Sequence, residues 1–119
     1  MKDFRNLKVW EKAHTLSLSI YRCTRTFPKD EVYGLTSQMR RASTSIGANI
    51  AEGCGKDSDA ELKRYLLIAM GSSSELENYL LLARDLEYFG HEEYARIQTD
   101  LVDVRKMLNA FIQKLKTNH

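Results

Sequence analysis

The sequence contains few of the residues that cross-link, kink or interrupt a chain. Its 119 residues include two cysteines, one proline and six glycines. Cys23 and Cys54 form no Cys-x-x-Cys motif and are too few for a disulfide framework, so we expect reduced thiols and a cytoplasmic location. The single proline, Pro28, leaves room for long helices, because proline interrupts a helix when it lies inside one.

Long apolar runs and a large excess of one charge are also missing. The longest uncharged stretch is far below the ~20 residues that cross a bilayer. Early charges exclude an apolar signal segment, so we expect no membrane contact. The formal net charge of +2 permits an acidic partner but is lower than is usual for a dedicated nucleic-acid domain. The length and a hydrophobic content of 43% predict one soluble domain over residues 1–119.

No constellation of residues predicts catalysis or a resident metal. Glu11 and His14 form one Glu-x-x-His motif, whereas carboxylate-bridged di-iron bundles need two such motifs and two further glutamates. Residues 53–56 (GCGK) follow a predicted helix rather than a strand and lack the spacing of a phosphate-binding loop. No serine, histidine and acid can be grouped as a nucleophilic triad. We therefore predict a non-enzymatic protein without metal or cofactor, and we identify no small-molecule substrate.

Apolar residues recur every three or four positions, which is the spacing of one helix face. The first predicted helix covers residues 6–26 and ends before Pro28, because the residue preceding proline avoids helical geometry. The second covers residues 31–52 and is closed by Gly53 and Gly55, which readily adopt the left-handed backbone found after helix ends. The apolar stripes are Val9, Ala13, Leu16, Ile20, Cys23 and Phe27 in the first helix, and Val32, Leu35, Met39, Ala42, Ile46 and Ile50 in the second.

Two longer helices follow. The third is predicted over residues 58–89, beginning at the capping-box pair Ser58 and Glu61 and ending at Gly90. The fourth is predicted over residues 91–116. Their stripes are Leu62, Leu66, Ala69, Ser73, Leu76, Leu80 and Ala83, and then Tyr94, Ile97, Leu101, Val104, Leu108, Phe111 and Leu115. Because short connections place successive helices antiparallel, the sequence predicts an all-α, up-down-up-down four-helix bundle.

The third predicted helix is apolar on more than one face. It carries no charge over residues 65–74, although a bundle helix needs only one apolar stripe. Leu67 and Ile68, and again Leu81 and Leu82, lie off the stripe that faces the core. Either this helix is central to its own bundle or these side chains form a subunit interface. Since no helix of a four-helix bundle is central, we favour a homo-oligomer interface.

A polar stripe follows the second predicted helix beside its apolar stripe. It consists of Gln38, Arg41, Ser45, Asn49 and Glu52, and the third helix offers Ser72 and Glu75 midway along its length. One interpretation is a ligand or nucleic-acid site. The other is a hydrogen-bonded network at the edge of the core or between subunits, which we favour because each unmade buried polar bond costs ~1–3 kcal/mol.

Several segments of the chain carry a family resemblance. They are residues 7–13 (LKVWEKA), 27–31 (FPKDE), 33–38 (YGLTSQ), 40–42 (RRA), 49–53 (NIAEG) and 71–76 (GSSSEL). Together they resemble a bacterial family of four-helix-bundle proteins, some of which are encoded in intervening sequences of large-subunit ribosomal RNA genes. The resemblance covers nearly the whole chain. The chain departs from the family pattern at Gly47, where relatives often have proline, and at Lys56, where arginine is common.

The resemblance implies an up-down bundle that assembles into a ring-like homo-oligomer, a pentamer. It also implies similarity to the accessory variability proteins of diversity-generating retroelements, which are basic pentameric bundles that bind nucleic acid. No established enzymatic activity comes with the family.

Two functions are consistent with these features. The first is a homo-oligomeric binding or scaffold protein that contacts RNA or DNA weakly through basic patches repeated in each subunit, because repetition raises avidity. Its candidate contacts are Arg40, Arg41, Lys56 and Lys63, although Arg41 also belongs to the polar stripe. The second is a protein–protein adaptor without a nucleic-acid role. An enzyme with a site between subunits, near Glu52 or Glu75, is the least favoured alternative.

Overall fold

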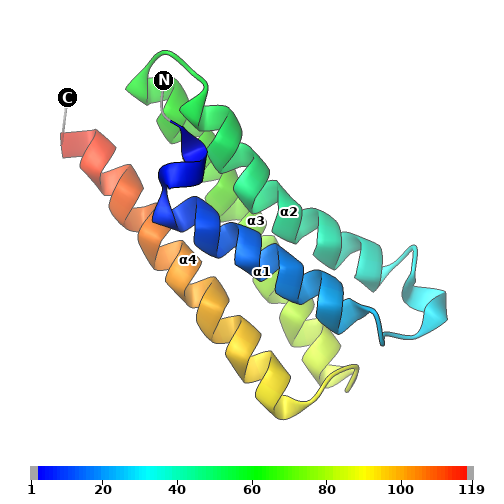
Figure 1. The fold of residues 1–119 in the computed structure, drawn as a ribbon. Helices are drawn as coiled ribbons and strands as arrows, with labels where there is room; N and C mark the ends of the chain where they lie inside the picture. The colour runs from blue at the N-terminus through cyan, green and yellow to red at the C-terminus, as the bar shows by residue number, and fades with distance from the viewer. Residues whose placement is uncertain (1–2, 118–119) are drawn as a thin grey trace.

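Four long helices pack side by side in the structure, a computed structural model that describes residues 3–117, with side chains to residue 115. The elements in chain order are η1 (Phe4–Asn6), α1 (Lys8–Thr24), η2 (Lys29–Glu31), α2 (Leu35–Cys54), α3 (Asp59–Asp85) and α4 (His91–Thr117), where η1 and η2 are short 3-10 turns. Figure 1 shows the helices alternating in direction, with α1 beginning and α4 ending beside the α2–α3 connection. Residues 3–117 contain no strand, so the predicted all-α four-helix bundle is confirmed.

The predicted apolar stripes meet to form one core. The largest fully buried side chains are Leu16, Ile20, Met39, Ile46, Ile50, Leu66, Leu76, Leu80, Ile97, Leu101, Val104 and Leu108. Burying a side chain of this size stabilises the fold by about 1.5–3 kcal/mol, so this core holds the four helices together. Three predicted stripe positions differ, and one of them is Tyr94, which is only partly buried. Val32 is 51% exposed because it lies before α2, and Ile112 rather than Phe111 is the buried residue near the end of α4.

The first helix begins later and ends earlier than the predicted range 6–26. The Asp3 side chain accepts a hydrogen bond from the backbone N–H of Arg5 and caps η1, and Leu7 is extended (φ −87°, ψ 128°). This extended residue separates η1 from α1. At the other end Thr24 is the last residue of α1, and the chain turns over Arg25 before it reaches Pro28.

The second helix is shifted relative to the predicted range 31–52. Its start is set by Glu31, whose Oε1 accepts a hydrogen bond of 3.0 Å from the backbone N–H of Leu35. Its end was predicted from the left-handed preference of glycine, and that reason is wrong. Gly53 lies inside α2, and Gly55 at the C-cap has a φ of −83°. Gly53 instead packs closely against Leu62 and Tyr65 of α3.

The third helix ends at Asp85 rather than at residue 89, because the chain turns before Gly90. Glu87 has a φ of 60°, in the left-handed region. The backbone N–H of Tyr88 donates to the carbonyl of Ala83 (3.0 Å), and that of Glu87 donates to the carbonyl of Arg84 (3.0 Å). This pair of hydrogen bonds is a Schellman motif, which usually has glycine where this chain has Glu87. The fourth helix, predicted over 91–116, agrees within one residue.

Candidate functional site

The polar stripe of α2 lies against α3, its most extensive neighbour in the bundle. The Oγ atoms of Ser45 and Ser72 are 2.9 Å apart and share a hydrogen bond. Asn49 donates from Nδ2 to the carbonyl (2.8 Å) and to Oγ (3.0 Å) of Ser45. The small serine side chains bring the two helices together, and the bonds satisfy polar groups that are only half exposed to water.

A second group of polar contacts lies one to two turns away on the same face of α2. Gln38 Oε1 accepts hydrogen bonds from Nη2 of Arg41 and from Oη of Tyr79, the latter at 3.5 Å. Tyr79 is absent from the predicted stripe. Its spacing of seven from Ser72 places the two on one face of α3, which is the signal that would have found it. We call Gln38, Arg41, Ser45, Asn49, Ser72 and Tyr79 the polar seam.

Two of the predicted network residues stay outside this seam. Glu52 and Glu75 are exposed, and within residues 3–115 neither side chain makes a hydrogen bond or an ion pair. In the same region one buried side-chain polar atom lacks a partner, Gln98 Oε1 on α4, which is not part of the seam. The hydrogen bonds of the seam therefore form two groups, and each group joins α2 to α3.

The candidate nucleic-acid residues are spread over two ends of the bundle. Arg40 donates from Nε to Thr24 Oγ1 (2.9 Å) and lies 4.6 Å above the Tyr21 ring, so it binds α2 to α1. Lys56 lies 5.4 Å from the centre of the Tyr65 ring at the α2–α3 connection. Lys63 lies nearby on the first turns of α3 and is partly exposed. Arg40 and Arg41 thus already have partners within the chain.

The outer face of α3 carries no charged side chain over residues 65–74, and exposed Glu75 follows that stretch. Leu67 is 50% exposed, Ile68 41%, Leu81 37% and Leu82 46%. Gly71 and Ser74 lie exposed between these two pairs, and an added Cβ at Gly71 would meet nothing within 4 Å. We call Leu67, Ile68, Gly71, Ser74, Leu81 and Leu82 the α3 face. Exposed leucines along one helix are typical of a contact surface rather than of a solvated one.

A shallow apolar groove of ≈ 440 Å³ runs between α1 and α2. Its α1 wall carries large side chains and its α2 wall small ones: it is lined by Trp10, His14, Ser17, Leu18 and Tyr21, and by Thr44, Gly47, Ala48 and Ala51. The rings of Trp10 and His14 stack with centroids 4.8 Å apart. An added Cβ on Gly47 would lie 3.5 Å from Nε1 of Trp10, an ordinary van der Waals contact, so the indole packs beside this glycine without requiring it.

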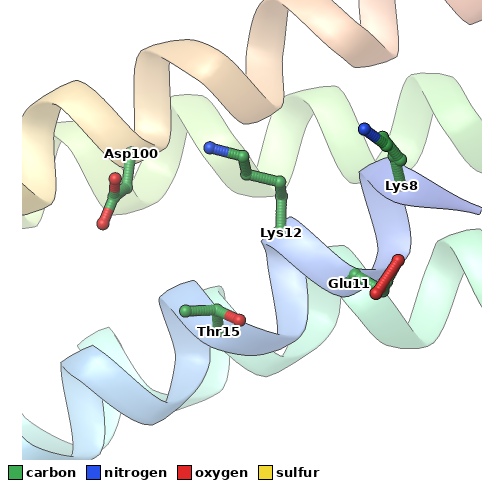
Figure 2. A pocket seen from close by; sticks show the side chains of 5 residues that line it. All are labelled: Lys8, Glu11, Lys12, Thr15 and Asp100. Atoms are coloured by element: carbon green, nitrogen blue, oxygen red, sulfur yellow. The ribbon is translucent and has the colours of Figure 1, made fainter.

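A second groove, of ≈ 340 Å³, lies between α1 and α4. Figure 2 shows its lining residues, which are Lys8, Glu11, Lys12 and Thr15 on α1 and Asp100 on α4. Lys12 forms an ion pair of 3.5 Å with Asp103. The charges are mixed in sign and exposed, so the groove has no polarity that selects one ligand.

The Glu-x-x-His motif does not form the half of a metal site. Glu11 lines the α1/α4 groove, whereas His14 stacks on Trp10 in the α1/α2 groove. Among the described side chains, no group of three or more histidines, cysteines, aspartates and glutamates lies close enough to hold a metal ion.

The buried Cys23 thiol does not have the environment of a nucleophile. Burial raises the pKa of Cys23 to about 12, with the nearby Glu93 carboxylate as the second cause. A thiol of this pKa stays protonated at neutral pH, and the thiolate is the reactive form.

Residues 5–110, most of the chain, match the family described as 23S rRNA-intervening sequence protein. The chain belongs to this family. A crystal structure described as that of a protein with unknown function from the S23 ribosomal protein family of Bacteroides thetaiotaomicron is similar to this structure. It is 29% identical, with a TM-score of 0.82 over 88% of this chain and 95% of the other. No curated protein matches the chain.

Membership of this family agrees with the predicted resemblance and with the bundle. Within residues 3–117 no helix has the length and apolarity needed to cross a membrane. The family and the similar structure have no known function, so the function of this chain has to be inferred from its surfaces.

Proposed function

We propose that this protein is a non-enzymatic, cytoplasmic scaffold that assembles with copies of itself through the α3 face, and that the assembly contacts nucleic acid weakly. The α3 face is the observation that carries the proposal. Its four large apolar side chains are 37–50% exposed on a helix whose inner side is already buried in its own core. Removing them from water stabilises an assembly by about 25 cal/mol per Å² of apolar area covered.

The other surfaces support a scaffold rather than an enzyme. The polar seam is occupied by contacts between α2 and α3. Cys23 and Cys54 are buried, and the mixed charges of the α1/α4 groove are exposed to solvent. The family resemblance implies a ring of five subunits.

For nucleic-acid contact, Lys56 and Lys63 are the stronger candidates of the predicted four, because they lie before and within the first turns of α3 and neither forms an ion pair with a described residue. Arg40 and Arg41 would have to leave their partners in α1 and α2. Two lysines per chain give weak binding to nucleic acid. A ring presents the same pair of lysines once in each subunit, and this repetition raises the avidity of the whole assembly.

The first experiment is native mass spectrometry of untagged protein, purified at low salt, together with the double variant Leu67→Glu/Leu82→Glu. We expect an oligomer for the wild type and a monomer for the variant, because two carboxylates cannot be buried unpaired in an apolar contact. Tyr33→Glu is the matched control, since Tyr33 is 94% exposed and lies outside the α3 face. A monomeric wild type at micromolar concentration would contradict the proposal.

Nucleic-acid contact is tested by fluorescence anisotropy with a single-stranded RNA at increasing salt. Lys56→Ala/Lys63→Ala should reduce the slope of log K against log salt by about 1–2 per subunit, since each lost phosphate contact removes about 1. Lys29→Ala is the control, because Lys29 is exposed in η2, in the α1–α2 connection, whereas Lys56 lies in the α2–α3 connection. An oligomer that binds no RNA and co-purifies with a defined protein would support the adaptor alternative instead.

A further inference from the structure

A third groove lies where α1, η2 and the start of α2 meet, and we call it the cationic groove. It has a volume of ≈ 510 Å³ and is lined by Thr24, Arg25, Phe27, Pro28, Lys29, Val32, Thr36 and Arg40. Small-molecule sites have volumes of roughly 300–1,000 Å³. Three of the lining residues are cations and none is an acid, whereas the α1/α4 groove carries charges of both signs.

Thr36, in the first turn of α2, is the residue that indicates a ligand. It is 5% exposed, yet its hydroxyl forms no hydrogen bond with a described residue. Among the described side chains, the one fully enclosed polar atom without a partner is Gln98 Oε1. The Thr36 oxygen therefore reaches the surface, and the surface at Thr36 is the cationic groove. A nearly buried hydroxyl without a partner is unfavourable, so a ligand that accepts its hydrogen bond removes this cost.

The cations of the groove are available to an anion. Arg25 and Lys29 are exposed, and neither forms an ion pair with a described residue. Arg40 donates from Nε to Thr24 Oγ1 and from Nη2 to the Tyr21 carbonyl (3.3 Å). Because a guanidinium has five N–H donors, Arg40 keeps both bonds and still offers donors to a ligand that enters the groove.

The acids nearest in the sequence do not neutralise these cations. Asp30 is exposed in η2 and does not line the groove. Glu31 is occupied, because its two carboxylate oxygens accept from the Leu35 N–H and from Oη of Tyr88. The first turn of α2 holds no acidic residue, and the N–H groups at a helix start carry partial positive charge. The groove therefore favours an anion.

We propose that the cationic groove binds a small phosphate monoester that carries an apolar substituent. The phosphate lies among Arg25, Lys29 and Arg40 and accepts a hydrogen bond from the Thr36 hydroxyl. A phosphate monoester has a charge of about −1.5 to −2 at neutral pH and three acceptor oxygens, which match three cations and a hydroxyl better than a carboxylate does. This site goes beyond the proposed scaffold function and does not depend on self-association.

The apolar lining of the groove selects the rest of the ligand. Val32 is 51% exposed and Pro28 is also exposed, so a bound apolar group would cover both from water. Phe27 is 6% exposed and contacts the rings of Tyr88 and Phe89, with centroids 5.2 Å and 5.8 Å away, which hold it in place. An internal phosphodiester of RNA fits this site less well, because it has one charge and a sugar on both sides.

The first test uses phenyl phosphate and follows the broadening of its ³¹P resonance as wild-type protein is added. We expect saturable binding. Inorganic phosphate lacks the apolar group and benzoate lacks the second charge, so each should compete only at about tenfold higher concentration. No saturable binding at millimolar phenyl phosphate would overturn the inference, and so would equal competition by either compound.

Thr36→Val tests the hydroxyl, because valine has nearly the same shape and no oxygen. The hydroxyl has no partner in the free protein, so the free variant should be at least as stable as the wild type in urea unfolding. Its affinity for phenyl phosphate should fall about tenfold, the value of one hydrogen bond to a charged group. A destabilised free variant would mean that the hydroxyl has a structural partner, and unchanged affinity would mean that it does not meet the ligand. Either result overturns the site.

Arg25→Gln tests the charge, with Arg22→Gln as its matched control. Both arginines are exposed on or just after the last turn of α1, but only Arg25 lines the groove. Arg25→Gln should weaken phenyl phosphate binding about 2–5-fold, the range for an exposed charge pair, and Arg22→Gln should leave it unchanged. Equal weakening by the two variants would show diffuse attraction instead of a site and would overturn the inference.

The site and the proposed scaffold function fail separately. Lys29→Ala, which should leave RNA binding unchanged, should weaken phenyl phosphate binding because Lys29 lines the groove. A monomeric wild type that binds phenyl phosphate would contradict self-association and support the site. An oligomer that does not bind phenyl phosphate would overturn the site and leave the scaffold standing.

Discussion

Gly53 of α2 lies directly against Tyr65 of α3. An added Cβ on Gly53 would be 2.9 Å from the Cβ of Tyr65, 3.0 Å from Cδ1 of Leu62 and 3.3 Å from the Leu62 carbonyl oxygen. A backbone atom and a Cβ cannot move aside without moving the helix. Glycine at this position therefore sets how closely α2 and α3 approach at the end of the bundle where they are joined.

We predict that Gly53→Ala destabilises the fold by about 1–3 kcal/mol, the usual cost of overpacking a tight contact. The helix-forming preference of alanine offsets part of this cost. Urea unfolding followed by circular dichroism measures the free energy. Gly55→Ala is the matched control, because an added Cβ there is an ordinary 3.4 Å from the Glu52 carbonyl oxygen. Equal stabilities of the two variants would contradict this role of Gly53.

The hydrogen bond between Ser45 and Ser72 gives a second prediction. Each alanine substitution should cost about 1 kcal/mol, and Ser45→Ala should cost more than Ser72→Ala, because Asn49 also donates to Ser45 Oγ. A double-mutant cycle should give a coupling energy of about 0.5–1 kcal/mol, as contacting residues do. Additive effects would mean that the bond contributes nothing. Ser37→Ala, at an exposed serine of α2 outside the seam, is the control.

The left-handed residue after α3 gives a third prediction. Glu87→Gly should stabilise the fold by about 0.5–1 kcal/mol, because a left-handed backbone costs a residue with a Cβ about 1–2 kcal/mol, and part of this gain is offset by the greater freedom of glycine in the unfolded chain. Thermal and urea unfolding check it. Glu87→Ala removes the same charge without freeing the backbone, and it should not be stabilised. A Glu87→Gly protein no more stable than Glu87→Ala would show that the turn is unstrained.

Glu31 gives a pH-dependent prediction. Hydrogen bonds from the Leu35 N–H and from Oη of Tyr88 (2.8 Å) lower the pKa of Glu31 below its ordinary value of 4.5. A carboxyl with a lowered pKa in the folded state contributes stability above pH 4.5, and this contribution is lost as pH falls through the lower folded value. Glu31→Gln should therefore be less stable than the wild type near neutral pH, and the difference should shrink below pH about 4.5.

The partner group titrates at the opposite extreme. The hydrogen bond to Glu31 raises the pKa of Tyr88 above its ordinary value of 10.0. The contribution of Tyr88 is therefore present below pH 10 and is lost as pH rises through the higher folded value. Tyr88→Phe should abolish the alkaline loss and weaken the acid one. Urea unfolding midpoints measured from pH 3 to pH 11 check both the acid and the alkaline loss of stability. A constant difference between the wild type and Glu31→Gln across the acid range would contradict the capping role.

The bundle could be predicted from the sequence because the spacing of apolar residues is a local pattern that repeats along each helix. Stripes such as Leu62, Leu66 and Ala69 recur every three or four residues, and burying each stripe leaves little choice of fold. The helix ends were less predictable because single contacts decide them. Glu31 caps α2 from four residues away, and Glu87 accepts a backbone conformation that glycine usually adopts.

By itself the sequence determined the helical class, the antiparallel order and a third helix with more apolar surface than its own core needs. Only the tertiary structure decided which polar groups meet. Ser45 forms a hydrogen bond with Ser72, and Gln38 forms one with Tyr79. The side chains of Glu52 and Glu75 are exposed to solvent. Periodicity places a residue on a face of its own helix, whereas a contact depends on the rotation and spacing of two helices, which the packing of the whole core sets. The α1/α2 groove is such a feature, because its walls come from residues that lie far apart in the chain.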